Sequence, residues 1–155
     1  MAKIEYRDTT SQDMIELENN IRKSDIEELR LTFAGQSAGD VIRKSCELSD
    51  KDLLFSAFVD GKLACISGCI KHPEQERTGI CWNLGTDVLT KYAKRYTLDT
   101  KRAIAVMHDR YPLLYNVVDA GNSRTIKWLE MIGFKMTKRI NDGKLIIFES
   151  RYERA

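Results

Sequence analysis

Two asparagines in the last third of the chain have the setting of binding residues. Asn116 interrupts the apolar, β-rich run of residues 113–119, and Asn122 stands just before the helical pattern of residues 123–132. A polar amide in an apolar strand must find hydrogen-bond partners, and a ligand at an open strand edge is one solution. A neighbouring loop is an equal alternative for Asn116. Asn122 can likewise be a helix cap alone, since Asn122 or Ser123 can accept from the free N–H groups of a first helical turn.

A basic and aromatic segment, Lys91-Tyr-Ala-Lys-Arg-Tyr96, could also carry function. Lys91, Lys94 and Arg95 could meet phosphate groups through side-chain charge. A solvated basic connector explains the same composition equally well. The interleaved aromatic residues leave open a small nucleic-acid surface, but six residues are a small footprint for one.

The spacing of apolar residues predicts a mixed α/β layout around these candidates. Ile126, Leu129 and Ile132 recur at helical spacing, and Gly133 ends that helix. Asp60-Gly61 and Asn141-Asp-Gly143 predict hairpin turns. The predicted strands are residues 3–7, 53–59, 62–70, 80–88, 113–119, 134–140 and 144–149.

Capping patterns predict further helices in the first two thirds of the chain. Thr10-x-x-Asp13 is a weak capping box and Ser24-x-x-Glu27 a better one. A Gly-containing bend at residues 34–39 separates the second helix from a short one at residues 40–48. Thr97 or Asp99 is expected to cap a helix that runs to about Tyr111. The small residues of strand 62–70 predict that another side chain packs closely on it.

Length and composition exclude several classes of protein. A chain of 155 residues fits one domain, which we expect to span residues 1–155, and 43% hydrophobic with 31% charged residues is ordinary for a soluble globular protein. The net charge of +2 does not argue for a nucleic-acid partner. No apolar run approaches the roughly 20 residues of a membrane span. The start lacks a signal-peptide core, so cytoplasm is the expected compartment.

The four cysteines are expected to be reduced and mostly buried rather than metal ligands. Cys65 and Cys69 lie four residues apart in a predicted strand and so point to one face. Neither of the two histidines stands at a metal-ligand spacing from a cysteine. No metal site is expected.

The segment that begins at Asn122 resembles the last motif of the GNAT superfamily, the GCN5-related N-acetyltransferases. In that family an Asn opens a helix and Gly-Phe follows eleven and twelve residues later, as Asn122, Gly133 and Phe134 do here. The predicted order of elements is similar to the complete GNAT topology. The resemblance therefore implies an α/β (α+β) fold with a central mixed, mainly antiparallel sheet of about seven strands and flanking helices.

The resemblance implies transfer of an acetyl group from acetyl-CoA to an amine of a protein or a small molecule. The cofactor would lie between strands 80–88 and 113–119, which splay apart in that family, and a helix N-terminus would attract its pyrophosphate. The implied cofactor-binding residues are Leu84, Thr86, Lys91, Lys94, Arg95, Asn116 and Asn122. The family's Gly-rich loop would fall at residues 86–95, where its pattern is absent and Gly85 is the only glycine nearby.

The sequence does not identify the catalytic residues. Many GNAT enzymes carry a Tyr seven residues after the helix-opening Asn, and that position is Leu129 here, which cannot donate a proton. Tyr115 or Tyr96 could act as the acid from elsewhere. Four groups lie in range to act as the base: Glu47, Asp87, Asp119 and His108. His108 is better explained as a surface residue of its helix.

Residues 82–134 also resemble a divergent set of GNAT-like proteins of short-tailed bacteriophages, the internal virion protein A type. The shared features are Tyr115-Asn116-x-Val118, Gly121-Asn122 and a helix with Ile126 and Leu129 before Gly133. This resemblance implies a phage-encoded protein, in the host cytoplasm or the virion. An alternative to catalysis is then a GNAT-derived virion, assembly or host-interaction protein. A cleft filled by Trp82 or Tyr115 would favour that alternative.

Overall fold

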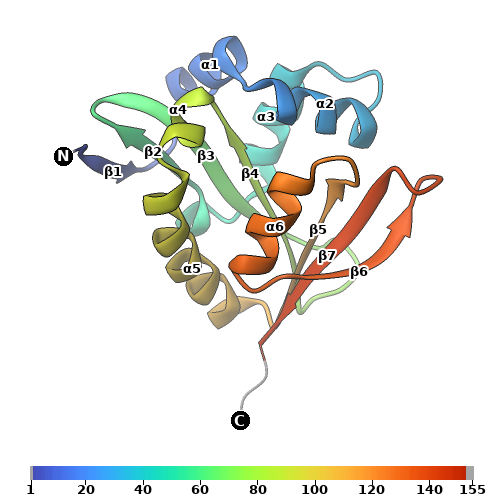
Figure 1. Cartoon of the computed structure of the whole chain (residues 1–155). Coiled ribbons are helices and arrows are strands. Elements are labelled where there is room, and N and C mark those ends of the chain that lie inside the picture. The colour runs from blue at the N-terminus through green and yellow to red at the C-terminus, as the bar shows by residue number, and fades with distance from the viewer. Residues whose placement is uncertain (1, 153–155) are drawn as a thin grey trace.

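The computed structural model describes residues 2–152 and has a seven-stranded sheet at its centre, with helices on both faces (Figure 1). The strands are β1 (Ile4–Arg7), β2 (Phe55–Val59), β3 (Lys62–Lys71), β4 (Thr78–Gly85), β5 (Leu113–Asp119), β6 (Lys135–Ile140) and β7 (Leu145–Arg151). Their order across the sheet is β1-β2-β3-β4-β5-β7-β6. Only β4 and β5 run parallel, and the other neighbours are antiparallel. The predicted mixed, mainly antiparallel sheet of seven strands is confirmed.

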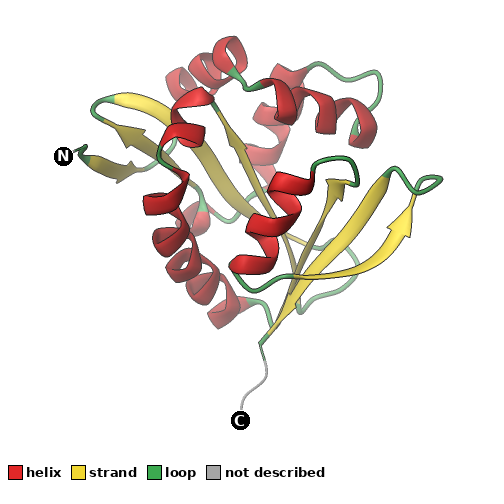
Figure 2. Ribbon diagram, viewed as in Figure 1, coloured by secondary structure: helices red, strands yellow, loops and turns green. Residues whose placement is uncertain are grey.

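The two largest of three apolar clusters hold helices to the two faces of the sheet. The helices are α1 (Ser11–Asn20), α2 (Lys23–Thr32), α3 (Ala38–Leu48), α4 (Asp87–Lys91), α5 (Ala93–Arg110) and α6 (Ser123–Met131), with a short 3-10 helix, η1 (Lys51–Leu53). One core joins α1 and α3 to the sheet around Leu17, Ile42 and Ile66, all fully buried. The other joins α5 and α6 to the opposite face around Met107, Leu114 and Leu129. Figure 2 shows the yellow sheet between these two layers of helices.

The parallel pair β4–β5 separates after three residues. Thr78, Gly79 and Ile80 pair with Leu113, Leu114 and Tyr115, whereas β5 stays paired with β7 along its whole length. Figure 1 shows β4 and β5 diverging from this point, with α6 beside the opening. The second halves of the two strands therefore present unpaired edges to each other, which is unusual inside a sheet because backbone N–H and C=O groups need partners.

The hairpin turns and the first capping box are confirmed. Asp60, Gly61, Asn141, Asp142 and Gly143 all have positive φ, as tight hairpin turns require. Thr10 accepts from the Asp13 N–H, and the Asp13 side chain accepts from the Thr10 N–H. The expected close contact on strand β3 is made by Trp82, since a Cβ on Gly68 would lie 2.8 Å from its Nε1.

The second predicted capping box is wrong. Ser24 lies inside α2, whose N-cap is Arg22 and has no side-chain cap bond. A tertiary contact sets this start instead, because the Arg22 N–H donates to the Gly85 carbonyl at 2.9 Å. Local capping preference is weak enough to be overridden by such a contact.

The prediction for residues 86–111 is also wrong in two places. β4 ends at Gly85 rather than at residue 88, because the Thr86 hydroxyl accepts from the Val88 N–H and begins α4. The basic connector at residues 91–96 is helical, and α5 begins at Ala93 rather than at Thr97 or Asp99. Tyr96 is buried on this helix, whereas Lys94 and Arg95 are exposed, so the segment is the first turn of an amphipathic helix. Its high content of charged residues is what led to the prediction of a connector.

Smaller differences lie at other element ends. Leu53 belongs to η1 rather than to β2, and α3 begins at Ala38 because Ser37 accepts from the Asp40 N–H. Within residues 2–152, no helix is long and apolar enough to cross a membrane.

Candidate functional site

The divergence of β4 and β5 opens a cleft with two connected cavities. The first, which we call the α2 cavity, has a volume of about 170 Å³ and reaches from α2 and α3 to β5. The second, the α6 cavity, has a volume of about 250 Å³ and lies at the N-terminal end of α6. Arg22, Asn83, Thr125 and Trp128 line both cavities. The two are therefore parts of one opening, which we call the β4–β5 cleft.

Asn83 lies at the junction and carries an unsatisfied polar atom. Its Oδ1 is buried and has no hydrogen-bond partner, and the residue lines both cavities. A buried acceptor without a partner costs about 1–3 kcal/mol, so native proteins keep few of them. The position of the residue at the junction of the two cavities makes Asn83 a candidate ligand contact.

Asn116 ties the two diverging strands together where their pairing stops. Its Nδ2 donates to the Cys81 carbonyl at 2.8 Å, and its Oδ1 accepts from the Val117 N–H at 2.7 Å. The partner is a strand rather than the neighbouring loop that the sequence left open. Asn116 and Leu84 both line the α2 cavity, so these two predicted residues do lie at the cleft.

Asn122 is the N-cap of α6 and also lines the α6 cavity. Its Oδ1 accepts from the Thr125 N–H at 3.2 Å. The helix cap suggested by the sequence is confirmed. Because Asn122 also lies at the cleft, the same residue could cap the helix and contact a ligand.

We expect Asn122→Ala to lower the free energy of unfolding by about 1 kcal/mol, the usual effect of losing a side-chain cap. Denaturant unfolding followed by circular dichroism measures this. An unchanged midpoint would show that the cap bond contributes nothing to stability.

The α6 cavity is cationic. Arg22 and Arg124 line it, and no carboxylate side chain is among its described lining residues. The N-terminus of α6 adds the positive end of a helix dipole. The cavity therefore favours an anionic group, with guanidinium side chains that suit phosphate oxygens.

The other predicted cofactor residues do not line either cavity. Thr86 is 5% exposed, and its hydroxyl donates to the Leu63 carbonyl at 2.8 Å while capping α4. Lys91, Lys94 and Arg95 are exposed on α4 and the first turn of α5. The helix α4, with its own cap, occupies the place of the expected phosphate loop.

Asp25 fixes the far end of β4 to α2. Its carboxylate, 7% exposed as a residue, accepts from the Gly85 N–H at 2.8 Å and from Arg22 Nε at 2.8 Å. Together with the bond from the Arg22 N–H to the Gly85 carbonyl, both backbone groups of Gly85 are occupied by α2. α2 therefore holds the end of the cleft, where a strand partner for β4 is missing.

Glu28 is the most perturbed carboxyl group at the cleft. Burial raises the pKa of Glu28 to about 7, and the negative charges of Asp25 and Asp119 raise it further. A hydrogen bond from the Asp119 backbone N–H and the positive charge of Arg22 partly oppose this rise. Glu28 lines the α2 cavity together with Asp25. A carboxyl that titrates near neutrality can both hold and release a proton at physiological pH.

This pKa makes the folded protein less stable as pH rises. Because the folded state keeps a proton on Glu28 up to about pH 7 and the unfolded chain loses it near 4.5, stability falls between these two values. We expect Glu28→Gln to remove this decline and to unfold above pH 7 with a free energy higher by on the order of 2 kcal/mol. Glu27→Gln, at an exposed position of the same helix, is the matched control. Parallel stability–pH curves for Glu28→Gln and the wild type would contradict the assignment.

The structure places the acid and base candidates of the sequence analysis in different surroundings. Tyr96 lines the α6 cavity, and burial raises its pKa well above the ordinary value. Tyr115 lies beside His72, with ring centroids 5.9 Å apart, and Leu129 is a buried core residue. Tyr96 is thus the tyrosine of this pair that reaches the cleft.

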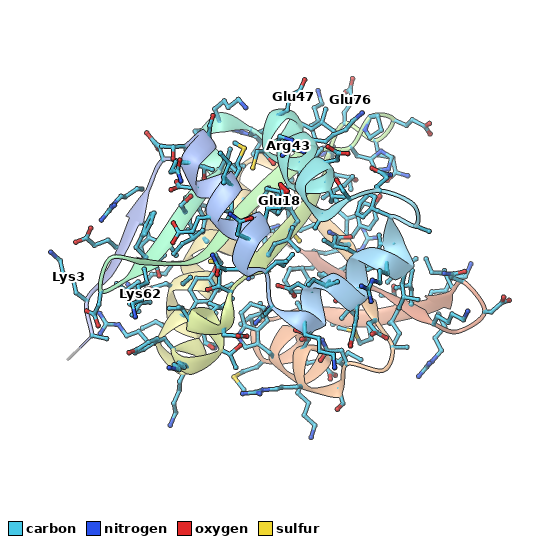
Figure 3. All side chains as sticks on the ribbon, turned by 90° about the horizontal axis from the view of Figure 1, so that it is seen from above. Lys3, Glu18, Arg43, Glu47, Lys62 and Glu76 are labelled. Carbon is cyan, nitrogen blue, oxygen red and sulfur yellow. The ribbon has the colours of Figure 1, made fainter. Side chains whose placement is uncertain are left out.

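None of the four candidate bases is among the residues that line the two cavities. His108 is bonded at both ring nitrogens, to the Tyr111 carbonyl at 2.9 Å and Ser150 Oγ at 2.8 Å. Glu47 projects outward from α3 (Figure 3), and Asp87 is exposed in the first turn of α4. Asp119 stands at the end of β5, near Glu28, and its Oδ1 accepts from the Gly121 N–H.

Trp82 does not fill the cleft. Its indole Nε1 donates to Ser49 Oγ at 2.9 Å, and the ring lies against Gly68 on β3. The residue forms a wall of the α2 cavity and leaves its volume open. The cysteines are free, as predicted, and burial raises the pKa of the Cys65 and Cys81 thiols to about 12.

Sequence analysis missed the face of α2 that lines the cleft. Arg22, Asp25 and Glu28 recur every three residues and alternate with the apolar positions that predicted the helix. The sequence shows that these three charged residues share one face of the helix. Such a face is interpreted as solvent-exposed surface unless another element is known to cover it. In α2 the buried residue is Asp25, not one of the predicted apolar positions.

Comparison with solved structures identifies the fold. The chain is similar to the ribosomal-protein-S18-alanine N-acetyltransferase of Escherichia coli, with a TM-score of 0.64 and 16% identity over 100% of this chain and 96% of that chain. It is similar to a GCN5-related N-acetyltransferase of Kribbella flavida, with a TM-score of 0.68 and 8% identity over 96% and 98%. It is also similar to yncA of Salmonella typhimurium, a structure with acetyl-CoA as cofactor, with a TM-score of 0.60 and 10% identity over 98% and 95%.

These identities are low, so the likeness is one of fold. The chain has the GNAT fold, as the sequence predicted. No protein-family profile matches the sequence, and no curated protein is significantly similar to it.

Proposed function

We propose that this protein transfers an acetyl group from acetyl-CoA to an amine, with both substrates meeting in the β4–β5 cleft. The observation that carries the proposal is the early end of β4–β5 pairing, which leaves an unpaired strand edge beside an unsatisfied buried acceptor, Asn83 Oδ1. The pantetheine arm of CoA carries amide N–H and C=O groups, which are the partners that such an edge lacks. The yncA structure with acetyl-CoA, which has the same fold, supports the choice of cofactor.

The charges of the cleft give the cofactor a direction. Arg22, Arg124 and the N-terminus of α6 would hold the pyrophosphate in the α6 cavity. Leu84, Asn116 and Asn122 would line the path of the arm toward the α2 cavity. Thr86 would support α4 rather than touch the cofactor. Lys91, Lys94 and Arg95, exposed on α4 and α5, would meet only phosphate groups outside the cleft.

Acetyl-CoA would supply an activated thioester, and the protein would supply position, charge and proton transfer. The rigid strands β4 and β5 would orient the thioester against the incoming amine. No tyrosine is among the described residues that line the α2 cavity, so the proton for the departing sulfur would come from the attacking nitrogen.

A second candidate function is of a different class. It is a binding protein that keeps the fold without the chemistry, the alternative that the resemblance to phage virion proteins implies. The observations that favour it are Leu129 at the position of the usual tyrosine and α4 at the place of the phosphate loop. The open cavities favour the enzyme, because a transferase needs room for both its cofactor and its acceptor.

Calorimetric titration with acetyl-CoA, with CoA as the control, tests the proposal. We expect micromolar binding, followed by release of free thiol when amines are added. Absence of binding at millimolar ligand would overturn the proposal in favour of the binding protein. Protein capture from cells would then become the next experiment.

A further inference from the structure

The face of α2 that lines the α2 cavity carries an acid, Glu28, that the proposed cofactor site does not use. Arg22, Asp25 and Glu28 lie on it, one helical turn apart, followed by Thr32 and Phe33. We propose that Glu28 accepts the proton of a cationic amine acceptor, which enters the α2 cavity with an apolar body against Trp82 and Phe33. The inference rests on the proposed acetyl transfer and adds to it the acceptor class and the base.

The two ends of the cleft differ in charge. Arg124 lines the α6 cavity alone, Asp25 and Glu28 line the α2 cavity alone, and Arg22 lines both. Arg22 and Asp25 already form an ion pair, with Nε and Oδ2 2.8 Å apart, so Glu28 is the acid left to face a second cation. An ammonium group in the α2 cavity would therefore be drawn to Glu28.

The charged and titratable groups around Glu28 come from three elements. Asp25 and Arg22 lie on α2, Asp119 lies at the end of β5, and the Cys81 thiol lies on β4 in the lining of the same cavity. The Cys81 pKa is raised to about 12, so that thiol stays neutral. The pKa of Glu28 near 7 fits a base that operates at physiological pH.

The walls of the α2 cavity define the body of the acceptor. Leu29, Phe33 and Trp82 line it, together with Ile70, Ile80 and Val41 from the sheet and α3. Phe33 is 38% exposed, which is high for so large an apolar side chain and places it at the mouth of the cavity. An arylalkylamine has an aromatic ring that could pack against these apolar walls and an ammonium group that could reach the Glu28 carboxylate.

Acetylation of an ammonium group requires the nitrogen to lose two protons. The ammonium loses one proton to the Glu28 carboxylate, which passes it to water. The nitrogen lone pair then forms the C–N bond as the C–S bond of the thioester breaks. The second proton of that nitrogen ends on the CoA sulfur, so the products are the acetamide, CoA thiol and one released proton.

The test compares two probe nucleophiles in Glu28→Gln and wild type. Phenethylamine is a cation at neutral pH and needs a base, whereas phenylhydrazine is already uncharged. We expect Glu28→Gln to lower kcat/KM for phenethylamine about 100-fold, the usual contribution of a general base, and to change the value for phenylhydrazine less than threefold or so. The rise of kcat/KM with pH near 7 should disappear in the variant.

Glu27→Gln is the matched control, since Glu27 is an exposed acid of the same helix paired with Lys23. It should behave as the wild type. Equal losses for both probes in Glu28→Gln would overturn the role as a base. A wild type that binds acetyl-CoA but acetylates neither probe would overturn the acceptor class. A wild type that binds no acetyl-CoA would instead refute the proposed function itself.

Discussion

Asp25→Ala is expected to lower the free energy of unfolding by about 3 kcal/mol, a large effect for a single side chain. The substitution leaves the Gly85 N–H without its acceptor and Arg22, whose side chain is 20% exposed, without its counter-ion. Denaturant unfolding measures the loss. Acetyl-CoA binding should weaken as well, because the contact between α2 and the end of β4 shapes the cleft.

Asp25→Asn separates the two causes of that loss. The amide oxygen can still accept from the Gly85 N–H, but the charge opposite Arg22 is gone, so we expect an intermediate stability. Glu27→Ala is the surface control. If Asp25→Ala unfolds at the wild-type midpoint, α2 is not held to β4 as described.

Asn83→Leu is expected to stabilise the free protein and to weaken cofactor binding. The substitution removes a buried oxygen that has no partner, for an expected gain of about 1 kcal/mol. The same oxygen is the proposed acceptor for a cofactor N–H, so acetyl-CoA affinity should fall at least about tenfold. Thermal unfolding and calorimetry measure the two effects in one variant.

The control for Asn83→Leu is Asn19→Leu, at an exposed position of α1. It should change neither property by much. A variant at position 83 that is less stable than the wild type would mean that Asn83 is bonded in solution, and unchanged affinity would remove it from the cofactor site. Opposite effects on stability and binding are the usual sign of a residue kept for function.

Two hairpins of the sheet and helix α6 could be predicted from the sequence because their signals are local, whereas the seven-stranded sheet was implied by the resemblance to the GNAT superfamily. Asp60-Gly61 and Asn141-Asp-Gly143 fix two hairpins through positive φ angles that few residues adopt. Asn122, Gly133 and the apolar spacing between them define α6 from end to end. These features need no knowledge of distant residues.

The errors occurred where distant contacts decide the local structure. The start of α2 is set by Gly85, which is far away in the sequence, so the Ser24 box had no influence. The segment around Tyr96 reads as a basic loop, yet Tyr96 is 4% exposed because it packs on Cys65 of β3. Neither of these contacts can be inferred from a single sequence.

The candidate site was predictable only in part for the same reason. Asn116 and Asn122 stand out because polar residues at a strand centre or helix start need an explanation. Asp25 and Glu28 do not, since charged residues on a helix are ordinary until the fold buries them. Their role appears only when α2 is seen to lie over the cleft.

Titration of the isotope-labelled protein with acetyl-CoA, followed by backbone amide chemical shifts, shows directly whether the cofactor binds in the β4–β5 cleft. We expect the largest shifts at the residues along this cleft, which are Asn83, Leu84, Asn116 and Asn122, with Arg22 at its end. Shifts concentrated on the exposed segment 91–95 alone, or no shifts at millimolar ligand, would contradict this expectation.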